Sequence, residues 1–187
     1  MAVRALAVAA ARAGTPRFAA AQLRAPAVGC FAKARFFSSA IATKTDGEMG
    51  TPEYRMRFQD ASGKDVSPWH DVPLTTGEAG VFNCIIEIPK MTKPKMEVAI
   101  KEAGNPIAQD VKKGKLRDYH GPIFWNYGMF PQTWEDPSVE HPVAKCSGDN
   151  DPLDVVEIGE KALAQGTIEP VKVLGVLAMI DDGELDW

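Results

Sequence analysis

The chain has 187 residues, of which 45% are hydrophobic and 25% are charged, so it is long enough for one domain with a sizeable core and has the composition of a soluble globular protein. No apolar run approaches the ~20 residues that a membrane helix needs, so we expect no membrane partner. The formal net charge is −4, but residues 1–45 hold seven of the 21 Lys and Arg and no acid. The remaining chain is therefore strongly acidic, which disfavours nucleic acid as a partner and favours divalent cations.

Residues 1–45 are predicted to be an organelle transit peptide that is disordered and lies outside the folded domain. The segment is rich in Ala, is punctuated by Arg, and contains no continuous apolar region of the kind found in secretory signals. A disordered tail without a targeting role is the alternative. Plastid and mitochondrial peptides share this composition. The folded domain is expected to comprise residues 46–187.

From Pro52 onwards the pattern predicts short strands joined by polar turns. Residues 54–59, 81–88 and 95–100 alternate or cluster apolar side chains as strands do. In the last of these segments Lys95 and Glu97 share the face opposite the apolar side chains, and a solvated face is the default interpretation of such a pair.

Later segments divide into a basic, an aromatic and an apolar stretch. Residues 112–117 form a dense cationic patch, which is either a solvated loop or a means of delivering Arg117 to an anion. The aromatic stretch 124–134 is interpreted mainly as core and loop packing. Residues 171–180 are the longest apolar strand candidate, and we expect this strand to be buried and to present the acidic turn at 181–187 on the rim of a sheet or barrel.

The acidic run at residues 149–154 contains the densest group of potential metal ligands. Three carboxylates this close repel one another unless cations share their charge, and Mg²⁺ is the first candidate. Asp149 and Asp151 fall on one side of an extended backbone, and the following proline lets Asp154 approach from another direction. A solvated acidic turn is the alternative. A calcium loop that ends at Glu160 fits less well, because Leu153 occupies a ligand position.

This acidic run is one of several blocks in which the chain resembles the soluble family I inorganic pyrophosphatases. Residues 149–155 match the D-x-D-P-x-D-aliphatic signature of that family. The further matching blocks, in the family's order, are residues 87–90, 95–97, 112–117, 126–128, 131–137 and 181–187. The resemblance covers the chain from Pro52 to Trp187, and the short spacing between Arg117 and Asn126 is most similar to the plastid-type eukaryotic branch.

The resemblance implies a fold, an activity and a location. The implied fold is mainly β, a five-stranded OB-like barrel with flanking helices that is α+β in the complete family. Family members continue beyond the position of Trp187, so we expect a C-terminally truncated member with an incomplete barrel and little activity of its own. The implied reaction is Mg²⁺-dependent hydrolysis of inorganic diphosphate to two phosphates, in a plastid or, alternatively, a mitochondrion. An inactive OB-like binding module and an acidic calcium-binding protein remain alternatives, and the oligomeric state stays open.

The resemblance also implies a role for each matching residue. The implied Mg²⁺ ligands are Asp149, Asp154, Asp186 and Asp181, and the acids that hold metal-bound water are Glu87 and Glu97. The groups that bind phosphate are Lys95, Arg117 and Tyr127, which we count as catalytic together with Asp151, the acceptor of the proton from the attacking water. Such a set is chemically coherent, because two or more Mg²⁺ ions would screen the highly anionic diphosphate and activate water.

Overall fold

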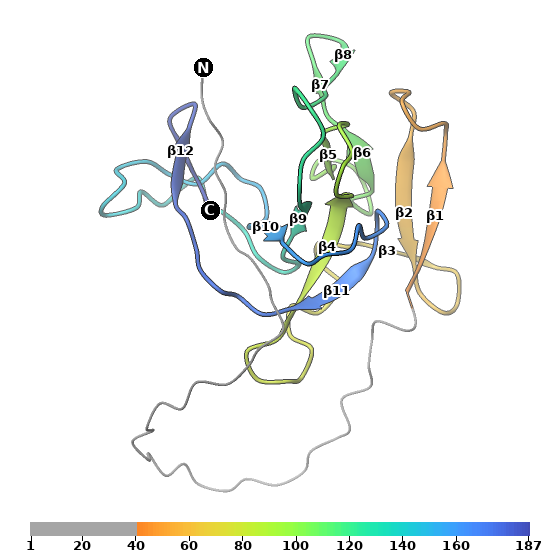
Figure 1. The fold of residues 1–187 in the computed structure, drawn as a ribbon, viewed down its shortest axis with the longest axis horizontal. Helices are drawn as coiled ribbons and strands as arrows, with labels where there is room; N and C mark the ends of the chain where they lie inside the picture. Colours follow the sequence, from red (N-terminus) through yellow and green to blue (C-terminus); the bar gives the residue numbers. More distant parts are fainter. Residues whose placement is uncertain (1–40) are drawn as a thin grey trace, which may run out of the picture.

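The computed structural model describes residues 41–187, which form thirteen β-strands and no helix (Figure 1). The mainly β prediction is confirmed, whereas the flanking helices of the complete family have no counterpart within residues 41–187. In this part of the chain no helix has the length and apolar character required to cross a bilayer. Most of the predicted transit peptide, residues 1–40, lies outside the described residues.

The first sheet has five strands: β1 (Ala42–Asp46), β2 (Arg55–Gln59), β3 (Asp65–Val66), β5 (Met96–Val98) and β6 (Ile107–Gln109). Their order is β1-β2-β6-β5, with β3 also paired to β2, and all pairs are antiparallel. Strand β1 includes residues 42–45, which the sequence analysis assigned to the leader. The sheet begins at Ala42, because residues 42–46 hydrogen-bond to β2 in register, and sequence composition does not reveal that pairing.

The second sheet has four antiparallel strands: β4 (Phe82–Ile88), β9 (Asn126–Met129), β10 (Asp154–Glu157) and β11 (Ile168–Val171). Their order is β10-β9-β4-β11. Strand β4 is buried along almost its whole length, with side chains in both hydrophobic clusters of the core. The close approach of β9 to β4 requires Gly128, because a Cβ at this position would lie 1.8 Å from the carbonyl oxygen of Ile85.

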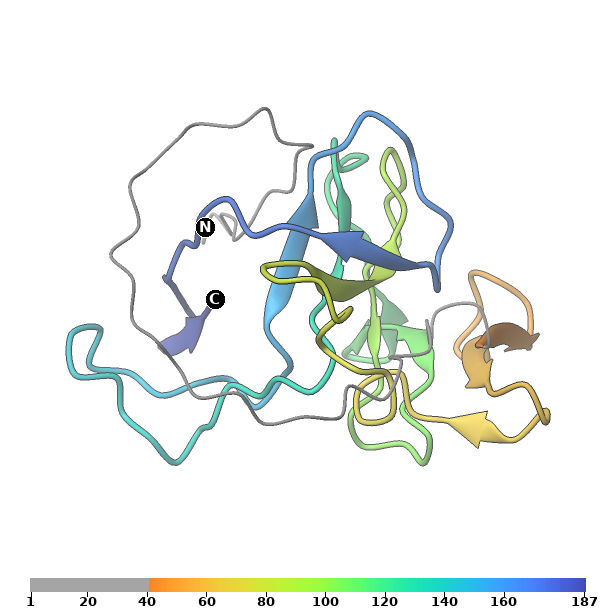
Figure 2. The same cartoon turned by 90° about the horizontal axis from the view of Figure 1, so that it is seen from below.

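The two sheets meet where β4 lies beside β5 (Figure 2). The Glu87 carboxylate at the end of β4 accepts a hydrogen bond of 2.7 Å from the backbone N–H of Val98 in β5. Apolar residues of both sheets, including Phe58, Ile85 and Ile107, pack into one cluster across this junction. Strand pairing within residues 41–187 gives these two open sheets and two two-stranded sheets, and no closed barrel.

Two hairpins extend from these sheets: β7 (Val111–Lys112) with β8 (Lys115–Leu116), and β12 (Met179–Asp181) with β13 (Glu184–Asp186). The expectation of one buried strand over residues 171–180 is wrong. β11 ends at Val171 and β12 begins at Met179, and residues 172–178 between them are exposed. Apolar composition predicted a strand here, but in the described part of the chain no neighbouring strand pairs with residues 172–178.

Candidate active site

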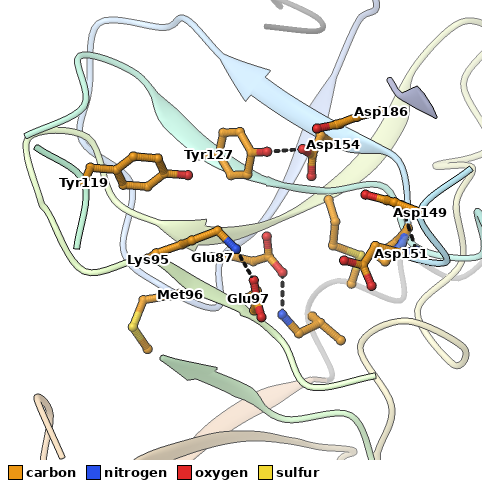
Figure 3. A pocket seen from close by; sticks show the side chains of 13 residues that line it. Glu87, Lys95, Met96, Glu97, Tyr119, Tyr127, Asp149, Asp151, Asp154 and Asp186 are labelled. Carbon is orange, nitrogen blue, oxygen red and sulfur yellow. Dashed lines mark hydrogen bonds and ion pairs between the residues drawn. The ribbon is translucent and has the colours of Figure 1, made fainter. Parts of the chain in front are cut away.

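Segments from different parts of the chain bring acidic side chains, tyrosines and a lysine to one pocket (Figure 3). They include β4, β5 with the residue before it, β9, residues 149–154 up to the start of β10, and the end of β13. Eight of the ten predicted site residues line this pocket: Glu87, Lys95, Glu97, Tyr127, Asp149, Asp151, Asp154 and Asp186. The remaining two, Arg117 and Asp181, do not line it.

The acidic loop is held in place by its own backbone and by Glu135. The Asp149 carboxylate accepts a hydrogen bond of 3.0 Å from the N–H of Asp151, which bends the loop. Asn150 between them adopts a left-handed φ of 75°, a conformation that Asn tolerates better than most residues. The backbone of Glu135 closes the arrangement by accepting from Asn150 N–H at 3.0 Å and donating to the Asp151 carbonyl at 2.9 Å.

Asp154 opens strand β10 and lies opposite Met129 of β9. Its carboxylate accepts a hydrogen bond from the Tyr127 hydroxyl, and its N–H donates to the Trp187 carbonyl at 3.1 Å. Burial raises the pKa of Asp154 to about 8, and the negative charges of Asp186 and Asp149 add to this increase, although the Tyr127 hydrogen bond opposes it. Burial and the neighbouring Asp154 likewise raise the pKa of Tyr127 well above its usual range.

Two other carboxylates of the pocket, those of Glu87 and Asp151, also have raised pKa values. Glu87 is only 4% exposed, and burial together with Asp154 raises its pKa well above the usual value. Burial and the charge of Asp149 raise the pKa of Asp151 to about 6. Among the residues that line this pocket, six are carboxylates and Lys95 is the one cation. Crowded carboxylates with raised pKa values indicate a site that needs additional positive charge.

A hard divalent cation fits this donor set, because such ions prefer carboxylate oxygens as ligands. As the side chains stand, no three His, Cys, Asp or Glu within residues 41–187 are arranged to hold one ion. The carboxylate oxygens are therefore suitable ligands for a metal ion, but their side chains would have to move closer together to bind one.

The cationic side of the pocket depends on a residue that sequence reasoning missed. The Lys95 ammonium contacts Glu97 and lies 3.2 Å from the Asp110 carboxylate. Arg117, which lies outside the pocket lining, donates to the same oxygen of Asp110. Asp110 lies outside every acidic motif of the sequence, so only the fold reveals its position.

Glu135 and Tyr119 were also missed. Glu135 is 6% exposed; one carboxylate oxygen accepts a hydrogen bond from Trp187 N–H at 3.2 Å, and the other is buried without a hydrogen-bond partner among the described residues. Burial raises the pKa of Glu135 to about 8, and the charges of Asp149 and Asp186 add to the effect. Glu135 belongs to the matching block at residues 131–137, and this match was the sequence signal that could have identified it. Tyr119 lines the pocket near Lys95 (Figure 3).

Asp181, unlike the other three predicted ligands, does not line the pocket. It lies in β12, opposite Glu184 in the β12–β13 hairpin, whereas Asp186 at the end of the same hairpin is buried and lines the pocket. The sequence block 181–187 is therefore divided between the pocket and its surroundings.

The family model described as inorganic pyrophosphatase matches residues 84–187, which contain all the pocket carboxylates. The chain belongs to the inorganic pyrophosphatase family. Soluble inorganic pyrophosphatase 6, chloroplastic, from Arabidopsis thaliana is 55% identical over 158 residues, which are 84% of this chain and 52% of the relative. The chain spans about half the length of the curated relatives it matches.

Solved pyrophosphatase structures share the fold. The type I inorganic pyrophosphatase from Toxoplasma gondii aligns with a TM-score of 0.74 and 47% identity, covering 79% of this chain and 66% of that one. An N-terminally truncated vacuolar soluble pyrophosphatase from Trypanosoma cruzi, solved in complex with PPi, aligns with a TM-score of 0.73 and 42% identity, covering 91% and 70%. The family indicated by the sequence resemblance is thus confirmed.

Proposed function

We propose that the protein hydrolyses inorganic diphosphate to two phosphates. The observation that carries this proposal is the convergence of six carboxylates and Lys95 on one pocket in a chain of the pyrophosphatase family. The T. cruzi relative described as a complex with PPi supports diphosphate as the substrate class. Because six carboxylates face one lysine, an anionic substrate would enter this pocket together with cations that offset the negative charge.

Metal binding in this proposal falls to the aspartates, and Mg²⁺ is the expected ion. Asp149, Asp154 and Asp186 would hold it within the pocket, and Asp181 would serve a further ion that enters with the substrate. When bound, Mg²⁺ would neutralise substrate charge and lower the pKa of a coordinated water. Glu87 and Glu97 would orient water around the ions through hydrogen bonds, a role that suits their place in the pocket lining.

The remaining residues act on the proton and on the phosphate groups. Asp151 would accept the proton of the attacking water, because it lines the pocket while its neighbours in the loop serve as metal ligands. Lys95 and Arg117 would bind phosphate oxygens through charge-assisted hydrogen bonds. The Tyr127 hydroxyl, which is directed at Asp154 in Figure 3, would donate to a phosphate oxygen when substrate enters.

A plastid is the proposed location, with the mitochondrion as the alternative. The acid-free, Arg-containing composition of residues 1–45 supports import into an organelle, and the Arabidopsis relative is named chloroplastic. Import of a fluorescent fusion into isolated chloroplasts and mitochondria would decide between the two.

The test of function is phosphate release by Asp151→Asn protein compared with the parent. The variant should lose activity by about 10²-fold or more, since general-base catalysis typically contributes this much. It should still bind Mg²⁺, because the proposed ligands are unchanged. Asp60→Asn, at an exposed turn between β2 and β3, removes the same charge as a control. Equal turnover in parent and Asp151→Asn protein would exclude the proposed role, and no turnover in any form would favour an inactive binding module.

A further inference from the structure

Asp110 connects the two side chains that are proposed to bind phosphate. It follows strand β6, and its Oδ2 atom accepts a hydrogen bond from Lys95 Nζ at 3.2 Å and another from Arg117 Nη1. Lys95 lines the pocket and Arg117 does not. The shared carboxylate oxygen therefore determines how closely the Arg117 guanidinium lies to the Lys95 ammonium.

The backbones of the same three residues are held by separate hydrogen bonds. Lys95 N–H donates to the Arg117 carbonyl at 2.9 Å, Asp110 N–H donates to the Lys95 carbonyl at 2.9 Å, and Arg117 N–H donates to the Asp110 carbonyl at 2.8 Å. The β7–β8 hairpin, drawn above β5 and β6 in Figure 1, returns the chain so that these bonds can form. A side-chain substitution at Asp110 should therefore disorder the two cations while the hairpin stays intact.

The environment of Asp110 favours a fixed, ionised carboxylate. The side chains of Asp110 and Lys95 are 16% and 15% exposed. Burial acts to raise the pKa of Asp110, but the charge of Lys95 and the hydrogen bonds from Lys95 and Arg117 outweigh it, so the pKa lies below its usual range. Lys and Arg have long side chains with many rotamers, and a buried carboxylate between them restricts both to one arrangement.

We propose that Asp110 is a positioning residue that holds the Lys95 ammonium and the Arg117 guanidinium as one pre-ordered pair for the phosphate oxygens of diphosphate. This inference rests on the proposed function of the pocket. A carboxylate close to an anion also repels it, so Asp110 has two opposing effects on binding. Neutralising Asp110 weakens diphosphate binding if order dominates, and strengthens it if charge dominates.

The test is calorimetric titration of methylenediphosphonate, a non-hydrolysable diphosphate analogue, in the presence of Mg²⁺. Asp110→Asn should raise the dissociation constant about 10-fold, because two pre-ordered ligands become disordered. Asp118→Asn is the matched control: this exposed carboxylate, also at the base of the hairpin, accepts a hydrogen bond from Gln109 at 2.9 Å. The control should change the constant less than about 2-fold, and Asp110→Glu should restore part of the affinity. Tighter binding by Asp110→Asn, or equal changes in Asp110→Asn and Asp118→Asn, would overturn the proposal.

Order of the Arg117 side chain gives a second readout that needs no ligand. In the parent protein the Arg117 Nε–H signal in NMR spectra should show restricted motion, and Asp110→Asn should make it mobile while Asp118→Asn does not. Unchanged order in Asp110→Asn would overturn the positioning role. If the parent fails to bind the analogue, the proposed function of the pocket is wrong, while this NMR comparison still decides whether Asp110 orders Arg117.

Discussion

Two regions of the molecule supply the pocket in different ways. The pocket wall, formed by β4, β9 and β10, is buried over most of its length. The arm, residues 172–187, exposes most of its apolar residues and joins the rest through a few backbone contacts, such as Leu185 N–H to the Ser147 carbonyl at 2.7 Å. The acid at the end of the arm, Asp186, is buried in the pocket, whereas Asp181 is not in its lining. Packing thus fixes the acids of the wall, while a few hydrogen bonds place those of the arm.

The largest expected contrast is between a carboxylate of the wall and one of the arm. Asp154→Asn should lower kcat/KM by about 10³-fold, equivalent to about 4 kcal/mol, because it alters a proposed metal ligand that also contacts Tyr127. Asp181→Asn, outside the pocket lining, should cost roughly 10-fold. Steady-state phosphate release measures both. Equal losses would show that the arm moves Asp181 into the site during turnover, which would break the distinction between the two regions.

Alanine substitutions at one glycine of the wall and one glycine of the arm test how tightly each region is packed. A Cβ at position 128 would lie 1.8 Å from the Ile85 carbonyl oxygen, whereas nothing lies within 4 Å of one at Gly175. Gly128→Ala should lower the free energy of unfolding by about 3 kcal/mol, since the clash is with backbone that cannot give way. Gly175→Ala should change it by less than about 0.5 kcal/mol. Urea unfolding measures both values, and a tolerated alanine at 128 would contradict the close approach of β9 to β4.

The smallest expected effect concerns thiol reactivity. Cys84 in β4 is fully buried, and Cys146, near the acidic loop, is partly exposed. Burial, followed by the charges of nearby glutamates, holds the pKa of the Cys84 thiol far above its usual range. At a pH of about 9 a thiol reagent should therefore label the partly exposed Cys146 and leave Cys84 unlabelled, because the buried Cys84 keeps its proton and only thiolates react. Peptide mass spectrometry distinguishes the two sites, and rapid labelling of Cys84 would show that the wall opens.

The sequence predicted several strands of the two larger sheets better than the arm. Strands β2, β4 and β5 fall within the predicted segments 54–59, 81–88 and 95–100, because alternating apolar residues report burial directly. The apolar residues 172–178 misled the same reasoning, since a strand also needs a partner with which to pair.

Site residues show a similar division. Family motifs supplied ten predicted site residues, and eight of these line the pocket. They gave no role to Asp110, whose contacts with Lys95 and Arg117 arise from the pairing of segments apart in sequence. Glu135 lay within a recognised block, but its burial beside the acidic loop depends on tertiary packing.

Metal-dependent turnover tests the central claim most directly. Phosphate release from diphosphate by the purified protein, which we expect to be slow, should require Mg²⁺, fall to background when EDTA is added, and return when excess Mg²⁺ is restored. The reason is that the six pocket carboxylates need added positive charge to admit an anionic substrate. Phosphate release that persists unchanged in EDTA would contradict the account, as would its absence at every Mg²⁺ concentration.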